Sequence, residues 1–271
     1  MTRHAKPFLA IFAALALLSL VAVMQRDTAS ASHAWSTYHW ARTANPFTLK
    51  LGDNVNGLWD VNLAVASADW SASTVLDTTI VAGLGGTNCK AQSGRIEVCN
   101  KKYGFNGWLG IAQISISGSH ITRATAKMND SYFNAAPYNT NAWRQLVMCQ
   151  EVAHGFGLGH QDETHNNPNL GTCMDYTSSP ASNMHPNGHD FEMLELIYAH
   201  VDAFTTVASS AVSSPFGAGR DGGLSGAEFG LAIGKEGHGR SNEFVQDLGN
   251  GQKIITHVFW VPGSERGHHE E

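Results

Sequence analysis

Short stretches in which apolar and polar residues alternate recur through the first half of the chain. A period of two is typical of β-strands that bury one face, and the β-branched residues within these stretches favour the same structure. Gly52-Asp53-Asn54 and Gly118-Ser119 are typical of the turns between such strands. The pattern therefore predicts a sheet of about five strands, over residues 47–51, 75–82, 95–98, 108–117 and 121–128.

Other stretches repeat their apolar residues every three or four positions, which is the helical period. In the first of them Trp59 and Trp70 fall on the apolar face, so both tryptophans are expected in the core. Thr140 or Asn141 can cap the second, because a side-chain oxygen at that position accepts from a free helical N–H. The helices are predicted over residues 58–72, 141–156 and 190–204, and together with the sheet they indicate an α+β fold.

The first 31 residues are typical of an export signal. Arg3 and Lys6 precede an almost unbroken apolar run over residues 8–24, and Ala29-Ser30-Ala31 offers small residues for cleavage. The alternative is an uncleaved membrane anchor, but the apolar run is slightly short for a membrane span. We therefore expect residues 1–31 to be removed and the mature protein to be secreted, with no stable membrane association afterwards.

The last quarter of the chain differs in composition from the region before it. Residues 205–226 are rich in Ser, Ala and Gly, like a linker. Residues 227–271 contain two strand-like stretches joined through Gly249-Asn250-Gly251, which is a hairpin signal, and end in a polar tail. The hairpin is either a small appendage or an extra piece of the sheet. A main domain over residues 32–204 is therefore expected to precede a linker and this hairpin.

The main candidate for chemistry is the series Gln150, Glu151, His154, Gly157 and His160. Positions 150 and 154 lie on one face of a helix, so their side chains point at the same place. Glu151 lies beside them, where it can take a proton from a water molecule on a metal ion. Gly157 lets the chain leave the helix through a left-handed conformation, after which His160 can reach the same metal.

This series is one residue away from the pattern H-E-x-x-H-x-x-G-x-x-H, and it resembles the metzincin clan of zinc endopeptidases. Met174 and Tyr176 match the turn beneath the zinc in that clan, and residues 140–204 resemble secreted bacterial matrixin-like proteins. The resemblance implies a twisted, mainly five-stranded sheet with two long helices, an active-site helix, a Met-turn and a C-terminal helix. It also makes the strand over residues 110–117 a candidate for the edge that pairs with substrate, with an ordinary inner strand as the alternative.

The departure from the pattern is Gln150 at the first ligand position. Its amide oxygen reaches about as far as a histidine nitrogen, but a neutral amide is a poor zinc ligand. Three interpretations follow: Gln150 is a weak third ligand, another residue substitutes for it, or the site binds zinc poorly. The neighbouring candidates for a substitute are Asp162, Glu163 and His165.

The resemblance implies a zinc endopeptidase that acts on a protein or peptide substrate. One catalytic zinc ion would be held by His154 and His160 together with Gln150 or its substitute. Glu151 would be the general base, and Tyr176 would stabilise the oxyanion. Met174 would support the site, and Asp162 with Glu163 could also hold a calcium ion. The rival function is a secreted binding or adhesion protein on a protease scaffold that has lost tight zinc binding through Gln150.

Charge and cysteine content refine this hypothesis. The net charge is −6 with no cluster of Lys or Arg, which argues against nucleic acid as a partner. Four cysteines in an exported protein can form two disulfides. Cys89 and Cys99 can close a local loop, and a Cys149–Cys173 bridge would fasten the Met-turn to the zinc-binding helix. Other pairings or free thiols are the alternatives.

Overall fold

The computed structural model describes residues 32–208, 229–233 and 241–263. The expected signal segment, the polar tail over residues 267–271 and most of the expected linker lie outside these ranges. None of the helices among the described residues is long and apolar enough to cross a membrane. Residues 32–271 group into one compact unit.

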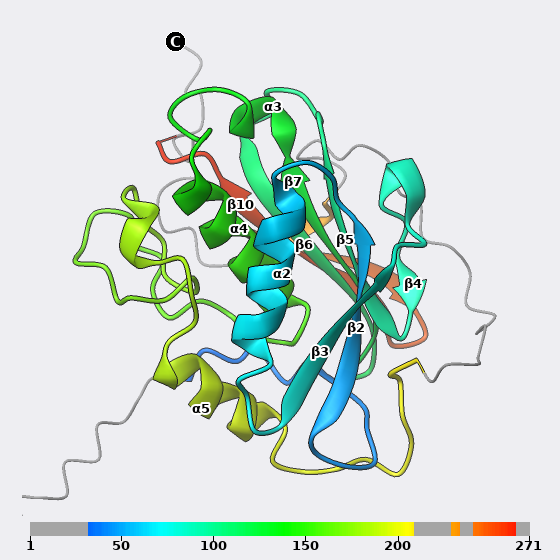
Figure 1. The fold of residues 1–271 in the computed structure, drawn as a ribbon. Helices are drawn as coiled ribbons and strands as arrows, with labels where there is room; N and C mark the ends of the chain where they lie inside the picture. The colour runs from blue at the N-terminus through cyan, green and yellow to red at the C-terminus, as the bar shows by residue number, and fades with distance from the viewer. Residues whose placement is uncertain (1–31, 209–228, 234–240, 264–271) are drawn as a thin grey trace, which may run out of the picture. The chain divides into compact units, whose positions relative to one another are not determined.

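One sheet carries all the strands of the described chain (Figure 1). Its main path runs β3-β2-β5-β7-β6-β10-β9-β8, and the short strands β1 and β4 both pair with β7. All five predicted strands are present, as β2, β3, β5, β6 and β7, so the mixed α and β architecture is confirmed. The bounds are β1 His39–Trp40, β2 Phe47–Asn54, β3 Leu76–Ala82, β4 Gln92–Ser93, β5 Arg95–Lys101, β6 Trp108–Ser117, β7 His120–Asn129, β8 Leu231–Ala232, β9 Glu243–Gly249 and β10 Gln252–Trp260.

The C-terminal hairpin is an extra piece of this sheet. Strand β10 pairs antiparallel with β6 from Gln252 opposite Ser117 to Trp260 opposite Trp108. Strand β6 is therefore an inner strand between β7 and β10, so the inner-strand alternative for residues 110–117 is confirmed and the free edge is wrong. The physical reason is that the backbone N–H and C=O groups of β10 pair along this edge of β6, so the edge is no longer open.

The helices are close to the predicted ones. Figure 1 shows α2 and α4 lying against the same face of the sheet. Thr140 caps α4 by accepting a hydrogen bond from the backbone N–H of Trp143. The third helix ends earlier than expected, because the chain after Tyr198 leaves the helix and bonds to the backbone of Arg42 and Ala41 instead. The bounds are α2 Trp59–Trp70, α3 Asp130–Phe133, α4 Asn141–His154 and α5 Gly188–Ile197, with short 3₁₀ turns at Gly86–Asn88 and Pro180–Ser182.

The core between helices and sheet fixes the position of α4. Trp59 and Trp70 are both buried, as predicted from their spacing. The indole N–H of Trp70 donates to the carbonyl of Cys149 at 3.2 Å, and its ring packs against Phe156 with centroids 5.6 Å apart. A buried tryptophan that finds a hydrogen-bond partner combines apolar area with a fixed orientation. Helix α2 thus holds the C-terminal half of α4 in place.

Both expected disulfides are present. Cys89 pairs with Cys99, and Cys149 in α4 pairs with Cys173 immediately before Met174, so the described chain has no free cysteine. Two disulfides are compatible with an extracellular protein. The second bridge joins the helix of the candidate site to the turn that carries Met174.

We expect the Cys149→Ser/Cys173→Ser double variant to lose about 3 kcal/mol of unfolding free energy. The bridge closes a loop of 24 residues, and opening it restores that entropy to the unfolded chain. Urea denaturation at matched protein concentration measures the loss. The matched control is Cys89→Ser/Cys99→Ser, which opens a loop that holds none of the candidate site residues. A Cys149/Cys173 variant as stable as the wild type would contradict the expectation.

Candidate metal centre

The C-terminal end of α4 carries the first part of the candidate centre. Gln150, Glu151 and His154 are all buried in its last two turns. Gly157 then has φ of +94°, and a Cβ atom added there would meet the carbonyl oxygen of Tyr38 at 2.1 Å. Only glycine fits both the positive φ and this close approach. The turn lets His160 come back toward α4, as the sequence predicted.

A third histidine comes from a distant strand. His257 lies in β10 and is fully buried. Its ring centroid lies 4.0 Å from that of His154 and 4.5 Å from that of His160. One ring nitrogen from each of the three histidines lies within 4.8 Å of the other two. The structure therefore brings together two predicted ligands and one that sequence reasoning missed.

Each of the three rings is oriented by a hydrogen bond on one nitrogen. Nδ1 of His154 bonds to the carbonyl oxygen of Leu158 at 2.7 Å, and Nδ1 of His160 bonds to Oε1 of Glu163 at 3.0 Å. Nε2 of His257 bonds to the hydroxyl of Tyr176 at 2.9 Å. The carbonyl and carboxylate partners of His154 and His160 place the proton on Nδ1 and leave a lone pair on Nε2, which is how metal-binding histidines are held. His257 has its lone pair on Nδ1 when its Nε2–H donates to the hydroxyl of Tyr176.

The remaining ring nitrogens test whether a metal fits. Nε2 of His154, Nε2 of His160 and Nδ1 of His257 are buried and have no hydrogen-bond partner among the described residues. A buried polar atom without a partner costs free energy, and three converging on one another need a shared partner. Three imidazole nitrogens with a position left for water are a donor set that zinc takes in catalytic sites. The residues present fit a zinc ion.

Burial and proximity keep two of these rings neutral. The pKa of His154 is well below its usual value, first because of burial and then because of the nearby His160. The pKa of His257 is also well below its usual value, through burial and through His154 and His160. Neutral imidazole is the form that binds a metal, so the environment favours the ligating state.

Glu151 lies beside the three nitrogens. Its Oε2 is 3.7 Å from Nδ1 of His257, and neither carboxylate oxygen has a hydrogen-bond partner among the described residues. Burial raises the pKa of this carboxyl well above its usual value. Gly110 of β6 makes room for it, because a Cβ atom there would meet Oε1 of Glu151 at 2.5 Å. A desolvated carboxylate next to a metal position is suited to proton transfer.

Gln150 keeps both of its amide atoms buried and without a partner among the described residues. It lies one helical turn before His154, so the amide remains available to the same centre. The three substitutes expected near the motif take other contacts. Asp162 bonds to the N–H of Thr164, Glu163 orients His160, and the ring of His165 stacks on Tyr176. Calcium binding by Asp162 and Glu163 stays a prediction.

The floor of the centre is the turn that carries Met174 and Tyr176. Met174 is fully buried, with its N–H bonded to Oγ1 of Thr172 and its carbonyl bonded to the N–H of Gln161. The hydroxyl of Tyr176 contacts His257 and accepts a hydrogen bond from Nδ2 of Asn242 at 3.1 Å. Burial raises the pKa of Tyr176 well above its usual value. The phenol therefore stays protonated and holds His257.

The centre is covered on the side of the N-terminal segment and of the C-terminal hairpin. The ring of Trp35 lies 5.3 Å from that of His154 and 6.5 Å from that of His257. Asn242, just before β9, bonds to Glu163 as well as to Tyr176. Exclusion of water strengthens electrostatic interactions inside such a site.

His257 was not predicted as a ligand, because it lies within an apolar strand-like stretch far from the motif in sequence. The sequence shows a histidine within the apolar stretch Lys253–Val261, and the period of two places it on the same face as Ile255 and Phe259. A polar residue on the buried face of a strand is the available signal for a site.

No protein-family model matches the chain, and no curated protein gives a significant match.

Proposed function

We propose that the protein is a secreted zinc-dependent endopeptidase whose metal ion is held by His154, His160 and His257. The observation that carries the proposal is the convergence of three buried, unpartnered ring nitrogens beside the buried carboxylate of Glu151. In this proposal the third ligand is His257 of β10, so Gln150 is not an essential ligand. Its amide remains near the metal as a polar group.

The chemistry follows from the positions of the protein groups. Zinc, when bound, lowers the pKa of water at the site toward neutrality and polarises a carbonyl oxygen. The Glu151 carboxylate accepts the proton that this water loses as it attacks the scissile carbonyl. Glu151 then returns the proton to the leaving amine nitrogen. Burial raises its pKa, so the carboxylate is a stronger proton acceptor than an ordinary glutamate.

Tyr176 takes a different role from the oxyanion donor that the resemblance implies. Its hydroxyl is engaged by His257 and by Asn242, so we assign it as a positioning residue for His257. A residue that orients a metal-binding histidine usually affects metal affinity by about 10- to 100-fold. In this proposal Met174 supports the floor of the site and takes no part in the chemistry.

Substrate cannot approach by adding a strand to β6, because β10 already pairs with that strand. The nearest groups over the centre are Trp35 and the segment at Asn242. A peptide would reach Glu151 when one of these two covers moves aside. Closing and opening of such covers is a common way to exclude water from a reaction.

Cleavage of casein by the purified chain over residues 32–271 tests the proposal. We expect cleavage that 1,10-phenanthroline abolishes and that added zinc restores, because the metal is needed to activate water. Mass spectrometry of metal content should show one zinc equivalent fewer in His154→Ala/His160→Ala than in the wild type. The Gln150→His variant should keep its activity, since position 150 is not an essential ligand here.

The same assay distinguishes the proposed peptidase from the rival function, a binding or adhesion protein. A chain that loses no zinc in the double-histidine variant and cleaves no protein would be a binding or adhesion protein on a protease scaffold. Appearance of both zinc binding and cleavage in Gln150→His alone would show that the natural centre had lost its metal. Either result would overturn the proposal.

A further inference from the structure

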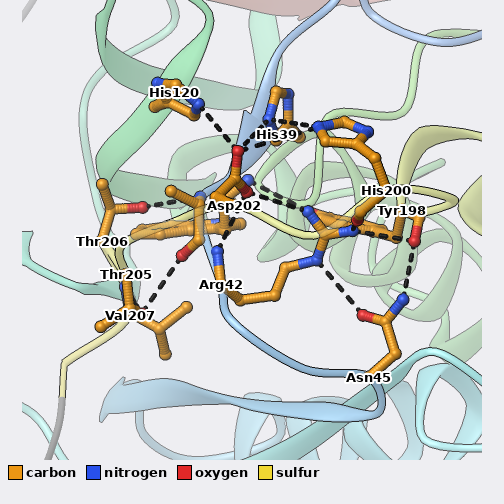
Figure 2. Close-up of polar contacts among 12 residues, drawn as sticks. His39, Arg42, Asn45, His120, Tyr198, His200, Asp202, Thr205, Thr206 and Val207 are labelled. Atoms are coloured by element: carbon orange, nitrogen blue, oxygen red, sulfur yellow. Dashed lines mark hydrogen bonds and ion pairs between the residues drawn. The ribbon is translucent and has the colours of Figure 1, made fainter.

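A second group of histidines surrounds Asp202, built from different elements from the first (Figure 2). His39 lies in β1 and is opposite His120 at the start of β7. His200 and Asp202 belong to the segment that follows α5. Figure 2 shows the three rings arranged around the carboxylate of Asp202. The first metal centre uses none of these residues.

The distances within this group suit a single small cation. Nε2 of His39 and Nε2 of His200 lie 3.2 Å apart. Oδ1 of Asp202 lies 3.7 Å from Nε2 of His39 and 3.8 Å from Nε2 of His200. Ligands bonded tetrahedrally to zinc at roughly 2.1 Å are about 3.4 Å from each other. Three donor atoms at this spacing leave room for a zinc ion and a fourth ligand.

Hydrogen bonds with neighbouring residues also orient His39 and Asp202. Nδ1 of His39 contacts the carbonyl oxygen of Thr37 at 2.8 Å, which places the proton on Nδ1 and the lone pair on Nε2. Oδ2 of Asp202 accepts hydrogen bonds from the backbone N–H and the guanidinium of Arg42, both at 3.2 Å. The other carboxylate oxygen, Oδ1, therefore faces His39 and His200. Such outer contacts to a carbonyl and to a carboxylate are typical of metal sites.

His120 has the geometry of a supporting partner. Its Nε2 lies 3.2 Å from Oδ1 of Asp202 and can donate to that oxygen. Within this second group, as far as the described residues go, the donor atoms of His39, His200 and Asp202 all lie within 4.8 Å of one another, and His120 is not part of that set.

Access to the site is available from one side. A cavity of about 290 Å³ is lined by His39 and His200 together with residues of the N-terminal segment and of α5. The side chain of His200 is 56% exposed. A metal ion can therefore enter without unfolding, and a water molecule can complete its coordination.

We propose that His39, His200 and Asp202 form a second zinc site, which ties strand β1 to the segment after α5. His39 and His200 are 161 residues apart in the sequence, so the ion would act as a cross-link between the two ends of the main domain. A ligand that binds only the folded state stabilises it by mass action. This site is independent of the proposed peptidase activity.

Zinc titration of a protein whose first centre is disabled tests the second site. In the background His154→Ala/His160→Ala, isothermal titration with zinc chloride should show about one binding equivalent, and zinc should raise the Tm. Adding His200→Ala or Asp202→Asn should weaken that binding at least about 100-fold and abolish the shift in Tm, because a direct ligand matters more than its supporting contacts. Asp202→Asn keeps the side-chain volume, and His200 is largely exposed, so both variants should fold.

The matched control is His185→Ala in the same background. His185 is 52% exposed and pairs with Asp69 at 2.7 Å, but it belongs to neither cluster of metal-binding groups in the described chain. Its replacement should leave zinc binding unchanged. If the background variant fails to fold, the stoichiometry of the wild type against His200→Ala decides instead, with two equivalents expected to fall to one. No zinc binding in the folded background, or equal binding after His200→Ala, would overturn the second site.

Discussion

Replacing His257 with alanine is expected to remove the zinc ion of the first centre and, with it, peptide cleavage. The variant takes away the Nδ1 atom that faces His154 and His160 and leaves two histidines with a neutral amide. Loss of a direct ligand should weaken zinc binding by roughly 100-fold or more, because even supporting contacts account for 10- to 100-fold. Competition with a chromogenic zinc chelator measures the affinity, and casein cleavage at limiting zinc measures the consequence.

A second substitution makes this result specific. In His257→Ala/Gln150→His the helix would carry histidines at positions 150 and 154, which are i and i+4 and lie on one face. We expect zinc affinity and cleavage to return toward wild-type values in this double variant. The control on the same strand is Lys253→Ala, which changes a partly exposed side chain away from the three histidines. Full zinc affinity in His257→Ala would show that Gln150, and not His257, completes the centre.

The local parts of the site could be predicted from the sequence. Positions 150, 151 and 154 come together through helical periodicity alone, and Gly157 shows its role through the turn that it permits. The pairing of Cys149 with Cys173 agrees with the same local geometry, since each lies next to a predicted site element. The five central strands are confirmed because each carries its own period-two pattern.

The long-range parts could not be predicted. Pairing of β10 with β6 depends on which strand edge is free in the folded sheet, and no local pattern reports that. The same pairing decides that His257 reaches the metal centre and that β6 has no free edge. The segment after Tyr198 continues an apolar repeat but leaves the helix, because Arg42 takes the carbonyl groups of Tyr198 and His200. Tertiary contacts outweigh helix propensity at such positions.

Both histidine clusters show why single residues in a pattern are weak evidence. His39, His120 and His200 lie far apart in the sequence and share no spacing, yet they meet at Asp202 (Figure 2). Their common feature is a position at or just beyond the end of an element: His39 begins β1, His120 begins β7, and His200 follows α5. Strand and helix ends from separate parts of a chain gather at one edge of a sheet, and binding residues are often found there.

Glu151→Gln is expected to abolish cleavage while the protein keeps its zinc. The amide has nearly the shape of the carboxylate but cannot accept the proton, and general base catalysis contributes about 10² to 10⁴ in rate. Removal of the buried charge should leave the fold intact, because neither oxygen of Glu151 has a hydrogen-bond partner to lose among the described residues. Casein cleavage with parallel metal analysis measures both properties. Glu195→Gln, at an exposed position of α5, is the control and should match the wild type.

The pH dependence of the wild type gives the same residue a second test. Burial raises the pKa of Glu151, and the base must be ionised to act, so activity should fall as the pH drops through that raised pKa. The acidic limb of the kcat/KM profile is thus expected at a higher pH than an ordinary glutamate would give. A limb at the ordinary position would place the proton acceptor elsewhere. Undiminished cleavage by Glu151→Gln would also show that the proton acceptor is a group other than Glu151. The three histidines would then form a metal site in which Glu151 is not the general base.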